Sequence, residues 1–183
     1  EFNVESMKKN ISDSTKMLVV IKADGYGHGG LQIARLLDDK EYIWGYAVAT
    51  LDEAVALRNG GIIKPLLVLG CIFPDQRECM IEQGIRMTVY TKEMAKEVSK
   101  LAERLHKKVY IHIKIDTGMS RLGFMAQDED IREIEEIAAL PGLVPEGMYT
   151  HFSKADETDK TFTRRQLAAY LRVKQSLEER GIT

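Results

Sequence analysis

The sequence has 183 residues, of which 44% are hydrophobic and 30% are charged, a composition typical of one globular unit with a substantial core. The formal net charge is −2 with acids and bases interspersed, which argues against a nucleic-acid partner or an anionic membrane surface. The longest apolar stretches, such as Met17–Ile21 and Leu66–Leu69, are too short to span a bilayer, and no signal or transit peptide is visible. Cys71 and Cys79 form neither a CxxC pair nor a disulfide framework, which favours the reducing cytoplasm.

Short apolar runs alternate with amphipathic segments along the whole chain. The runs predict strands at Met17–Lys22, Trp44–Ala49, Leu66–Gly70, Arg86–Tyr90, Val109–Ile115 and Val144–His151. The amphipathic segments predict helices at His28–Asp38, Leu51–Asn59, Asp75–Gln83, Lys92–His106, Asp128–Ala139 and Phe162–Arg180. Thr50, Asp75 and Thr91 lie where helix N-caps are needed. Such alternation predicts βαβ units on a parallel sheet.

The spacing of these elements separates two candidate folds. Roughly 30 residues per strand–helix unit is the pace of a (β/α)₈ barrel of the TIM type, which typically needs about 250 residues. We therefore expect residues 1–183 to form a single domain, an incomplete barrel of about six units, with a seventh strand starting at Gly181–Thr183. A six-stranded open sheet with doubly wound topology is the alternative.

Strand parity favours the barrel, because alternate residues of a strand face opposite sides of the sheet. In Val109–Asp116 the isoleucines share one face with Val109, whereas Lys114 and Asp116 share the other face with a histidine and a tyrosine. Lys22 ends an apolar run in the same way. We expect both lysines to project into the barrel near the carboxyl ends of their strands, where barrel enzymes keep their active sites.

The loop after Lys22, ADGYGHGG, contains four glycines and opens a helix. Glycine tolerates positive φ and lets backbone approach a ligand, and a helix N-terminus favours an anion. A lysine amine beside such a loop suits pyridoxal 5′-phosphate, held as a Schiff base. A dinucleotide site is disfavoured, because the glycine spacing is wrong and the next strand ends in Ala47–Thr50 without the acid that binds a ribose.

Three motifs in order, VVIKADGYGHG, KIDTGMSRLGF and EGMYTHFSKAD, resemble the alanine racemase family, which begins with a pyridoxal-phosphate-binding (β/α)₈ barrel. The resemblance covers nearly the whole chain, and bacterial serine racemases of the same fold match almost as well. It implies an isomerase that interconverts L- and D-alanine through a carbanion and supplies D-amino acid for the cell wall. A non-catalytic cofactor-binding barrel is the other alternative, although such proteins lack the DTGM-type arginine motif.

Carried over residue by residue, the resemblance implies roles for five side chains. Lys22 would hold the cofactor and act as one catalytic base, and the Tyr26 hydroxyl would reach its phosphate. Arg121 would approach the cofactor's phenolic oxygen and the substrate carboxylate, and His151 would line the cofactor pocket. Lys114 matches a lysine that is often carbamylated in the family; a buried neutral amine can react with carbon dioxide, and the resulting anion could fix Arg121.

The resemblance also implies parts that this sequence does not contain. A C-terminal β domain, whose tyrosine supplies the second acid–base group across a homodimer, and an arginine for the pyridine nitrogen belong to later sequence in the family. We therefore expect a fragment that is inactive alone, acting on a small amino acid when complete, in the cytoplasm, with no nucleic-acid or membrane partner. No Cys, His, Asp and Glu set has zinc-ligand spacing, so no metal is expected.

Overall fold

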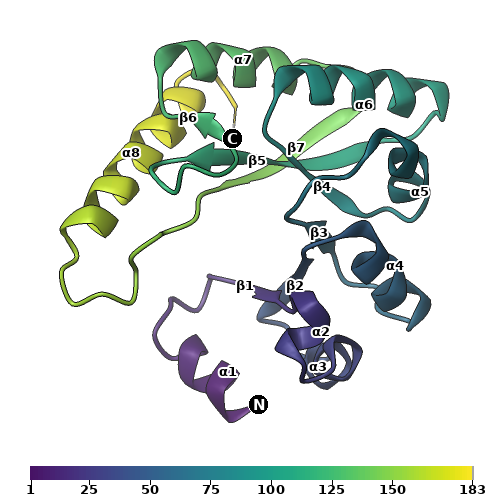
Figure 1. The fold of residues 1–183 in the computed structure, drawn as a ribbon, viewed down its shortest axis with the longest axis vertical. Coiled ribbons are helices and arrows are strands. Elements are labelled where there is room, and N and C mark those ends of the chain that lie inside the picture. Colours follow the sequence, from purple (N-terminus) through teal and green to yellow (C-terminus); the bar gives the residue numbers. More distant parts are fainter. Residues whose placement is uncertain (183) are drawn as a thin grey trace. The chain divides into compact units, whose positions relative to one another are not determined.

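A computed structural model describes residues 1–182 as two compact units, one of residues 1–87 and one that starts at Thr88 (Figure 1). Strand β4 (Arg86–Val89) crosses the boundary between them. The seventh strand was expected to start at Gly181–Thr183, and Thr183 lies outside the described residues. Each unit is an array of parallel strands connected by helices.

The first unit is a parallel sheet in the order β1–β2–β3–β4. Its elements are α1 (Phe2–Lys8), β1 (Met17–Val20), α2 (Lys22–Tyr26), α3 (Gly30–Leu37), β2 (Ile43–Val48), α4 (Leu51–Asn59), β3 (Leu66–Val68), the 3₁₀ helix η1 (Pro74–Gln76), α5 (Arg77–Glu82) and the start of β4. Because each parallel strand is followed by a crossover helix, the loops after the strands gather at one edge of the sheet.

Helix α4 begins where the sequence predicts, for a local reason. The Thr50 side chain accepts from the Glu53 backbone N–H, and the Glu53 carboxylate accepts from the Thr50 N–H, which together form a capping box. Leu51, Ala54 and Leu57 then recur on one face and are buried, and the helix packs on β2 and β3. The cap and the apolar stripe therefore place the first turn of α4 beside the carboxyl end of β2.

The second unit is centred on β5 (Val109–Asp116), which pairs in parallel with β7 (Leu143–Tyr149) and with the short β6 (Phe124–Met125). Its helices are α6 (Lys92–Arg104), α7 (Asp128–Ala138) and α8 (Thr161–Glu178). Helix α6 packs against α7, β5 and β7, and α7 packs against α8. The core is aliphatic, with Val98, Ile111, Ile115, Ile131, Ile134, Ile137 and Val173 all at most 2% exposed.

Several element boundaries differ from the sequence prediction. Asp75 is not an N-cap: it lies inside η1, and α5 begins after Gln76 without a side-chain cap. Thr50 and Thr91 do cap their helices, as predicted. Helix α1 was not predicted, because it buries no residue and therefore has no apolar stripe to reveal it. Strand β1 ends at Val20, so Lys22 is not its last residue.

Gly45 in β2 tests the close packing of this sheet. A Cβ there would lie 2.3 Å from the Pro65 carbonyl oxygen, so Gly45→Ala should lower the free energy of unfolding by about 3 kcal/mol, the upper part of the overpacking range, because backbone cannot move aside. Gly84→Ala is the matched control: space is open there and only its φ of +61° is unfavourable, so we expect a loss of about 1 kcal/mol. Urea unfolding measures both, and equal losses would contradict the steric explanation.

Candidate active site

Lys22 is the first residue after β1 rather than the end of it. The Ile21 N–H still donates to the Ala47 carbonyl in the manner of a strand, 2.9 Å away, but Ile21 itself has ψ 25° and the chain turns at Lys22. The Lys22 side chain is partly exposed. Within residues 1–182, its amine has no hydrogen bond or ion pair, so it is available to a ligand.

The turn after Lys22 is left-handed over five consecutive residues, Ala23 to Gly27, with φ between +51° and +85°. This conformation costs about 1–2 kcal/mol for each residue that carries a Cβ. Gly25 has a second reason to be glycine, since a Cβ there would lie 2.7 Å from the Ile33 side chain. The turn therefore gives Gly25 and Gly27 the first of the two roles expected from the sequence, a backbone with positive φ.

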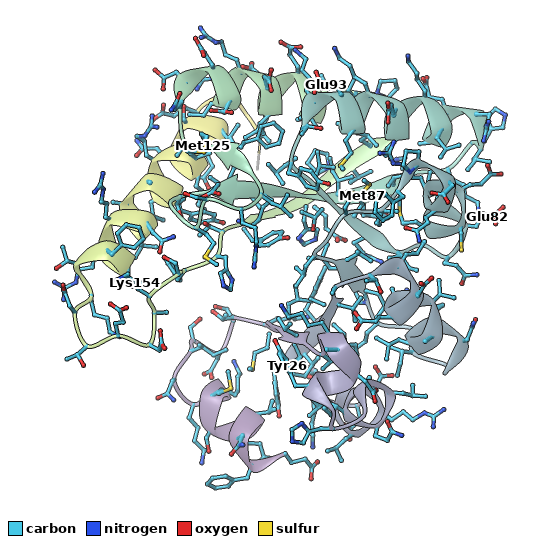
Figure 2. All side chains as sticks on the ribbon, in the orientation of Figure 1. Tyr26, Glu82, Met87, Glu93, Met125 and Lys154 are labelled. Atoms are coloured by element: carbon cyan, nitrogen blue, oxygen red, sulfur yellow. The ribbon has the colours of Figure 1, made fainter. Side chains whose placement is uncertain are left out.

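The turn leaves the Tyr26 side chain exposed and connects Asp24 to the start of α3. Tyr26 is 62% exposed (Figure 2), and its hydroxyl has no partner among the described residues. The Asp24 carboxylate accepts from the Gly30 N–H at 2.7 Å, at the start of α3. A protein carboxylate thus already occupies the helix end that the sequence analysis assigned to a phosphate.

In the second unit, β5 and β7 carry a polar row on the face opposite their helix-covered aliphatic residues. Lys114 is only 5% exposed, lies beside Tyr149 in the register, and places its amine 5.5 Å from the centre of the Tyr149 ring. The Tyr149 hydroxyl bonds to the Thr88 hydroxyl at 2.9 Å. On the same pair of strands His112 contacts Glu146, with 3.1 Å between Nε2 and Oε2. The predicted buried position of Lys114 is therefore observed.

Burial is the main cause that lowers the pKa of Lys114 below its ordinary 10.5; the nearby Asp116 charge opposes this effect and the Arg121 charge adds to it. Lys114 thus lies within electrostatic range of both Asp116 and Arg121. A lowered pKa increases the fraction of neutral amine, which is the form that acts as a nucleophile.

Asp116 shapes the loop that carries Arg121. Its carboxylate accepts from three backbone donors of the following loop, the N–H groups of Gly118, Ser120 and Arg121, at 2.8 to 3.0 Å. Burial alone would raise the pKa of Asp116, but these donors and Lys114 outweigh burial and the pKa is lowered. The Arg121 side chain is exposed and has no hydrogen bond or ion pair within residues 1–182. The loop therefore fixes the Arg121 backbone and leaves the guanidinium available.

Gln166 on α8 connects this loop with the one that carries His151, and the sequence analysis missed it. Gln166 is fully buried. Its amide nitrogen donates to the Thr117 hydroxyl and the His151 carbonyl, and its oxygen accepts from the Ser153 N–H and hydroxyl, all at 3.0 to 3.3 Å. His151 itself is exposed. Gln166 lies on the same face of α8 as the buried Val173 and Leu177. This shared face was the signal in the sequence from which burial of Gln166 could have been predicted.

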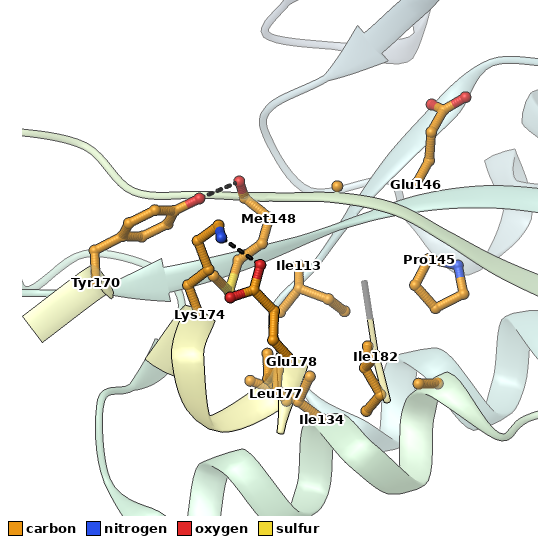
Figure 3. Close-up of a pocket in the computed structure, with 12 residues that line it drawn as sticks. Ile113, Ile134, Pro145, Glu146, Met148, Tyr170, Lys174, Leu177, Glu178 and Ile182 are labelled. Atoms are coloured by element: carbon orange, nitrogen blue, oxygen red, sulfur yellow. Dashed lines mark hydrogen bonds and ion pairs between the residues drawn. The ribbon is translucent and has the colours of Figure 1, made fainter. Parts of the chain in front are cut away.

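A cavity of about 170 Å³ lies elsewhere in the second unit, among β5, β7, α7 and α8 (Figure 3). Its lining includes Ile113 and Met148, which precede Lys114 and Tyr149 and therefore face the other side of the sheet. The Tyr170 hydroxyl donates to the Met148 carbonyl at 2.8 Å beside it. Glu146 contributes to both the cavity lining and the polar row, but Lys114 and Tyr149 do not line the cavity, which therefore does not belong to the candidate site.

The structure divides the five predicted site residues between the units: Lys22 and Tyr26 on one turn of the first, and Lys114, Arg121 and His151 around the ends of β5 and β7 in the second. Within each unit the residues lie near the carboxyl ends of parallel strands, Lys114 inside β5 and the other four after the strands, where (β/α)₈ enzymes place catalytic groups. No helix among the described residues combines the length and apolar character that crossing a membrane requires.

The family model "Alanine racemase, N-terminal domain" matches residues 1–183, and the chain belongs to this family. An alanine racemase of Clostridium tetani is 43% identical over 181 residues, covering 99% of this chain and 46% of that protein. The alanine racemase of Clostridium difficile 630 in complex with cycloserine superposes with a TM-score of 0.97 at 38% identity, covering 100% of this chain and 50% of that one. A histidine racemase of Leuconostoc mesenteroides superposes with a TM-score of 0.85 at 28% identity, over 94% and 46% of the two chains.

These similarities, with the alternation of parallel strands and helices, confirm the predicted fold class, an incomplete (β/α)₈-type barrel. The alternative of an open doubly wound sheet is excluded by the same matches. The chain spans about half the length of the curated relatives that it matches, 51% and 46% for two of them.

Gln166→Leu tests the connection between the two loops. The buried side chain at position 166 would no longer bond to the Ser153 N–H and the His151 carbonyl, so the free energy of unfolding should fall by about 1–3 kcal/mol. The Ser153 amide should also exchange with solvent deuterium at least about fivefold faster, because a loss of about 1 kcal/mol or more corresponds to a change of about fivefold or more in the opening equilibrium. Gln175→Leu on the exposed side of the same helix is the control and should change neither quantity. Unchanged exchange at Ser153 would contradict the assigned role.

Lys114 should make stability depend on pH in the alkaline range. The folded protein binds the Lys114 proton less tightly than the unfolded chain does, so raising the pH through the lowered pKa toward 10.5 should stabilise the fold. Urea unfolding in carbon-dioxide-free buffer between neutral pH and about pH 10 should show wild type gaining stability relative to Lys114→Met. Parallel pH profiles for the two proteins would contradict a lowered pKa.

Proposed function

We propose that this chain is the cofactor-binding barrel part of a pyridoxal-phosphate-dependent alanine racemase. The observation that carries the proposal is the Lys22 amine, which has no hydrogen-bond or ion-pair partner within residues 1–182 and stands directly before a left-handed turn, in a chain of the alanine racemase N-terminal family. An unpaired primary amine after a barrel strand is the chemical group that captures an aldehyde.

The donor groups of the chain fit such a cofactor. Lys22 would hold it covalently, and the exposed Tyr26 hydroxyl would donate to its phosphate. Arg121 would contact its phenolic oxygen and the substrate carboxylate, and His151 would line the pocket. The fit rests on three polar groups, those of Lys22, Tyr26 and Arg121, that have no protein partner among the described residues. Asp24 already satisfies the start of α3, so the phosphate contacts in this proposal come from Tyr26 rather than from that helix.

When bound, pyridoxal phosphate supplies an electron-withdrawing ring that stabilises negative charge at the substrate α-carbon. Lys22 would carry the α-proton on one face of the substrate, because racemisation needs an acid–base group on each face. The Arg121 guanidinium would orient the substrate carboxylate through charge-assisted hydrogen bonds. The group for the second face would come from the partner subunit of a homodimer, in a C-terminal β domain that follows this barrel domain.

Lys114 is proposed to carry a carbamate. Burial lowers its pKa, and the neutral amine can add to carbon dioxide with loss of one proton. The product is an anion within electrostatic range of Arg121, so it would hold the guanidinium in place. Intact-mass measurement under carbon dioxide, with Lys114→Met as the comparison, would detect the added mass of one carbon dioxide.

Alanine is the proposed substrate because the relatives at about 40% identity are named alanine racemases. The same fold also serves a histidine racemase at 28% identity. Fold alone therefore does not select the amino acid, and serine racemisation remains the second candidate. The proposed compartment is the cytoplasm, which suits two exposed free cysteines, Cys71 and Cys79.

Reduction with borohydride after addition of pyridoxal phosphate tests the proposal in the full natural chain that contains these residues. Peptide mapping should find the reduced cofactor on Lys22. Lys22→Arg should lower the rate of alanine racemisation by about 10³-fold or more, since both the covalent hold and one proton-transfer group are lost. Lys16→Arg, an exposed lysine before β1, should leave the rate unchanged. Cofactor found on another lysine of the wild-type protein would refute the assignment.

A further inference from the structure

The Glu53 carboxylate bonds to backbone on two different loops. Its Oε1 accepts from the Ala23 N–H at 2.6 Å, directly after Lys22, and its Oε2 accepts from the Ala49 N–H at 2.7 Å and from the Thr50 N–H at 3.3 Å. The Ala23 N–H comes from the loop after β1, and the other two come from the loop after β2. One side chain therefore joins the carboxyl ends of two neighbouring strands.

Helix capping explains only the weakest of these bonds. A capping box needs the contact between Glu53 and the Thr50 N–H, which is the longest of the three. The shortest bond reaches Ala23, thirty residues earlier in the sequence and outside α4. The geometry of Glu53 thus serves the turn after Lys22 as well as the helix that carries it.

The bond to Ala23 acts directly on Lys22, because the Ala23 N–H and the Lys22 carbonyl belong to one rigid peptide plane. The preceding plane is also fixed, since the Ile21 carbonyl accepts from the Gly25 N–H at 2.8 Å. With both flanking planes held, the Lys22 backbone torsions are set, and with them the direction in which its side chain leaves the main chain. Of the two constraints, only the one from Glu53 depends on a side chain.

We propose that Glu53 is a positioning residue that aims the Lys22 amine at the aldehyde of the cofactor, an inference that rests on the proposed function of Lys22. The step concerned is a condensation. The Lys22 nitrogen adds to the aldehyde carbon, the aldehyde oxygen leaves as water with the two amine protons, and a C=N bond remains. Glu53 does not touch the reacting atoms, so its effect is on the orientation of the amine before this step.

Three variants of the full natural chain separate this role from helix stability. Glu53→Gln keeps the shape but has one acceptor oxygen, and its NH₂ would face a backbone N–H. Glu53→Asp keeps the charge and is one methylene too short to serve both loops. Thr50→Val is the matched control: it removes the side-chain acceptor for the Glu53 N–H at the start of the same helix and leaves the Glu53 carboxylate unchanged.

The measurement is the rate at which borohydride-trapped cofactor accumulates on Lys22, followed by peptide mapping below the unfolding temperature of every variant. Both Glu53 variants should label Lys22 about tenfold more slowly than wild type, the change expected for one charge-assisted hydrogen bond. Thr50→Val should label at the wild-type rate even if it melts at a lower temperature. The slowing should be the same with pyridoxal, which lacks the phosphate, because the defect lies in the lysine.

Each other outcome has a distinct meaning. Wild-type labelling rates in both Glu53 variants would overturn the proposal, as would equal slowing in Thr50→Val, which would indicate general loosening of α4. Slowing with pyridoxal phosphate alone would also overturn it and would place the effect at the phosphate. If wild type is labelled at another lysine, the proposed function fails first and the role of Glu53 fails with it.

Discussion

A backbone N–H that leaves the end of a parallel strand loses its ladder partner, and an unpaired polar group near the core is costly. In this protein the loops that bear the candidate site meet that requirement with single polar side chains. Glu53 serves the loop after β1, and Asp116 serves the loop after β5. Gln166 joins the loop after β5 to the loop after β7. The same bonds that satisfy the backbone also determine where the functional side chains begin.

The turn after Lys22 is a case in which such bonds accompany an unfavourable backbone conformation. Three of its five left-handed residues carry a Cβ, and no regular helix or strand of L-residues would hold them in that conformation. Glu53 accepts from the N–H of Ala23, where the turn begins, and Asp24 accepts from the N–H of Gly30, where α3 begins after the turn. Strained backbone of this kind persists where surrounding contacts over-determine it, and it is concentrated at functional sites.

The sequence predicted the features that depend on local pattern. Alternating apolar runs located every strand of four residues or more, and the threonines at 50 and 91 were recognised as caps because capping is decided within four residues. Burial of Lys114 followed from strand parity alone. Three ordered motifs were enough to assign the family, and the family model matches residues 1–183.

What the sequence could not predict depends on residues distant in the chain or on backbone torsions. Lys22 was expected at the end of a strand, but the strand stops at Val20 because the chain enters a left-handed turn, and torsions of this kind have no periodic signature. Glu53 reads as an ordinary helix-capping residue until its bond to Ala23 is seen. Gln166 reads as a polar interruption of an apolar face, and only the fold shows that four polar atoms surround it.

Because one buried amide on α8 holds both the Thr117 and the His151 segments, these loops are not independent modules. In a chimera that exchanges only one of these loops between relatives, the Gln166 amide would have to bond to a loop that evolved beside a different side chain. Recombination should therefore succeed most often when crossover points keep residues 117–166 together. In such libraries the inherited block, rather than the individual loop, would be the unit on which selection acts.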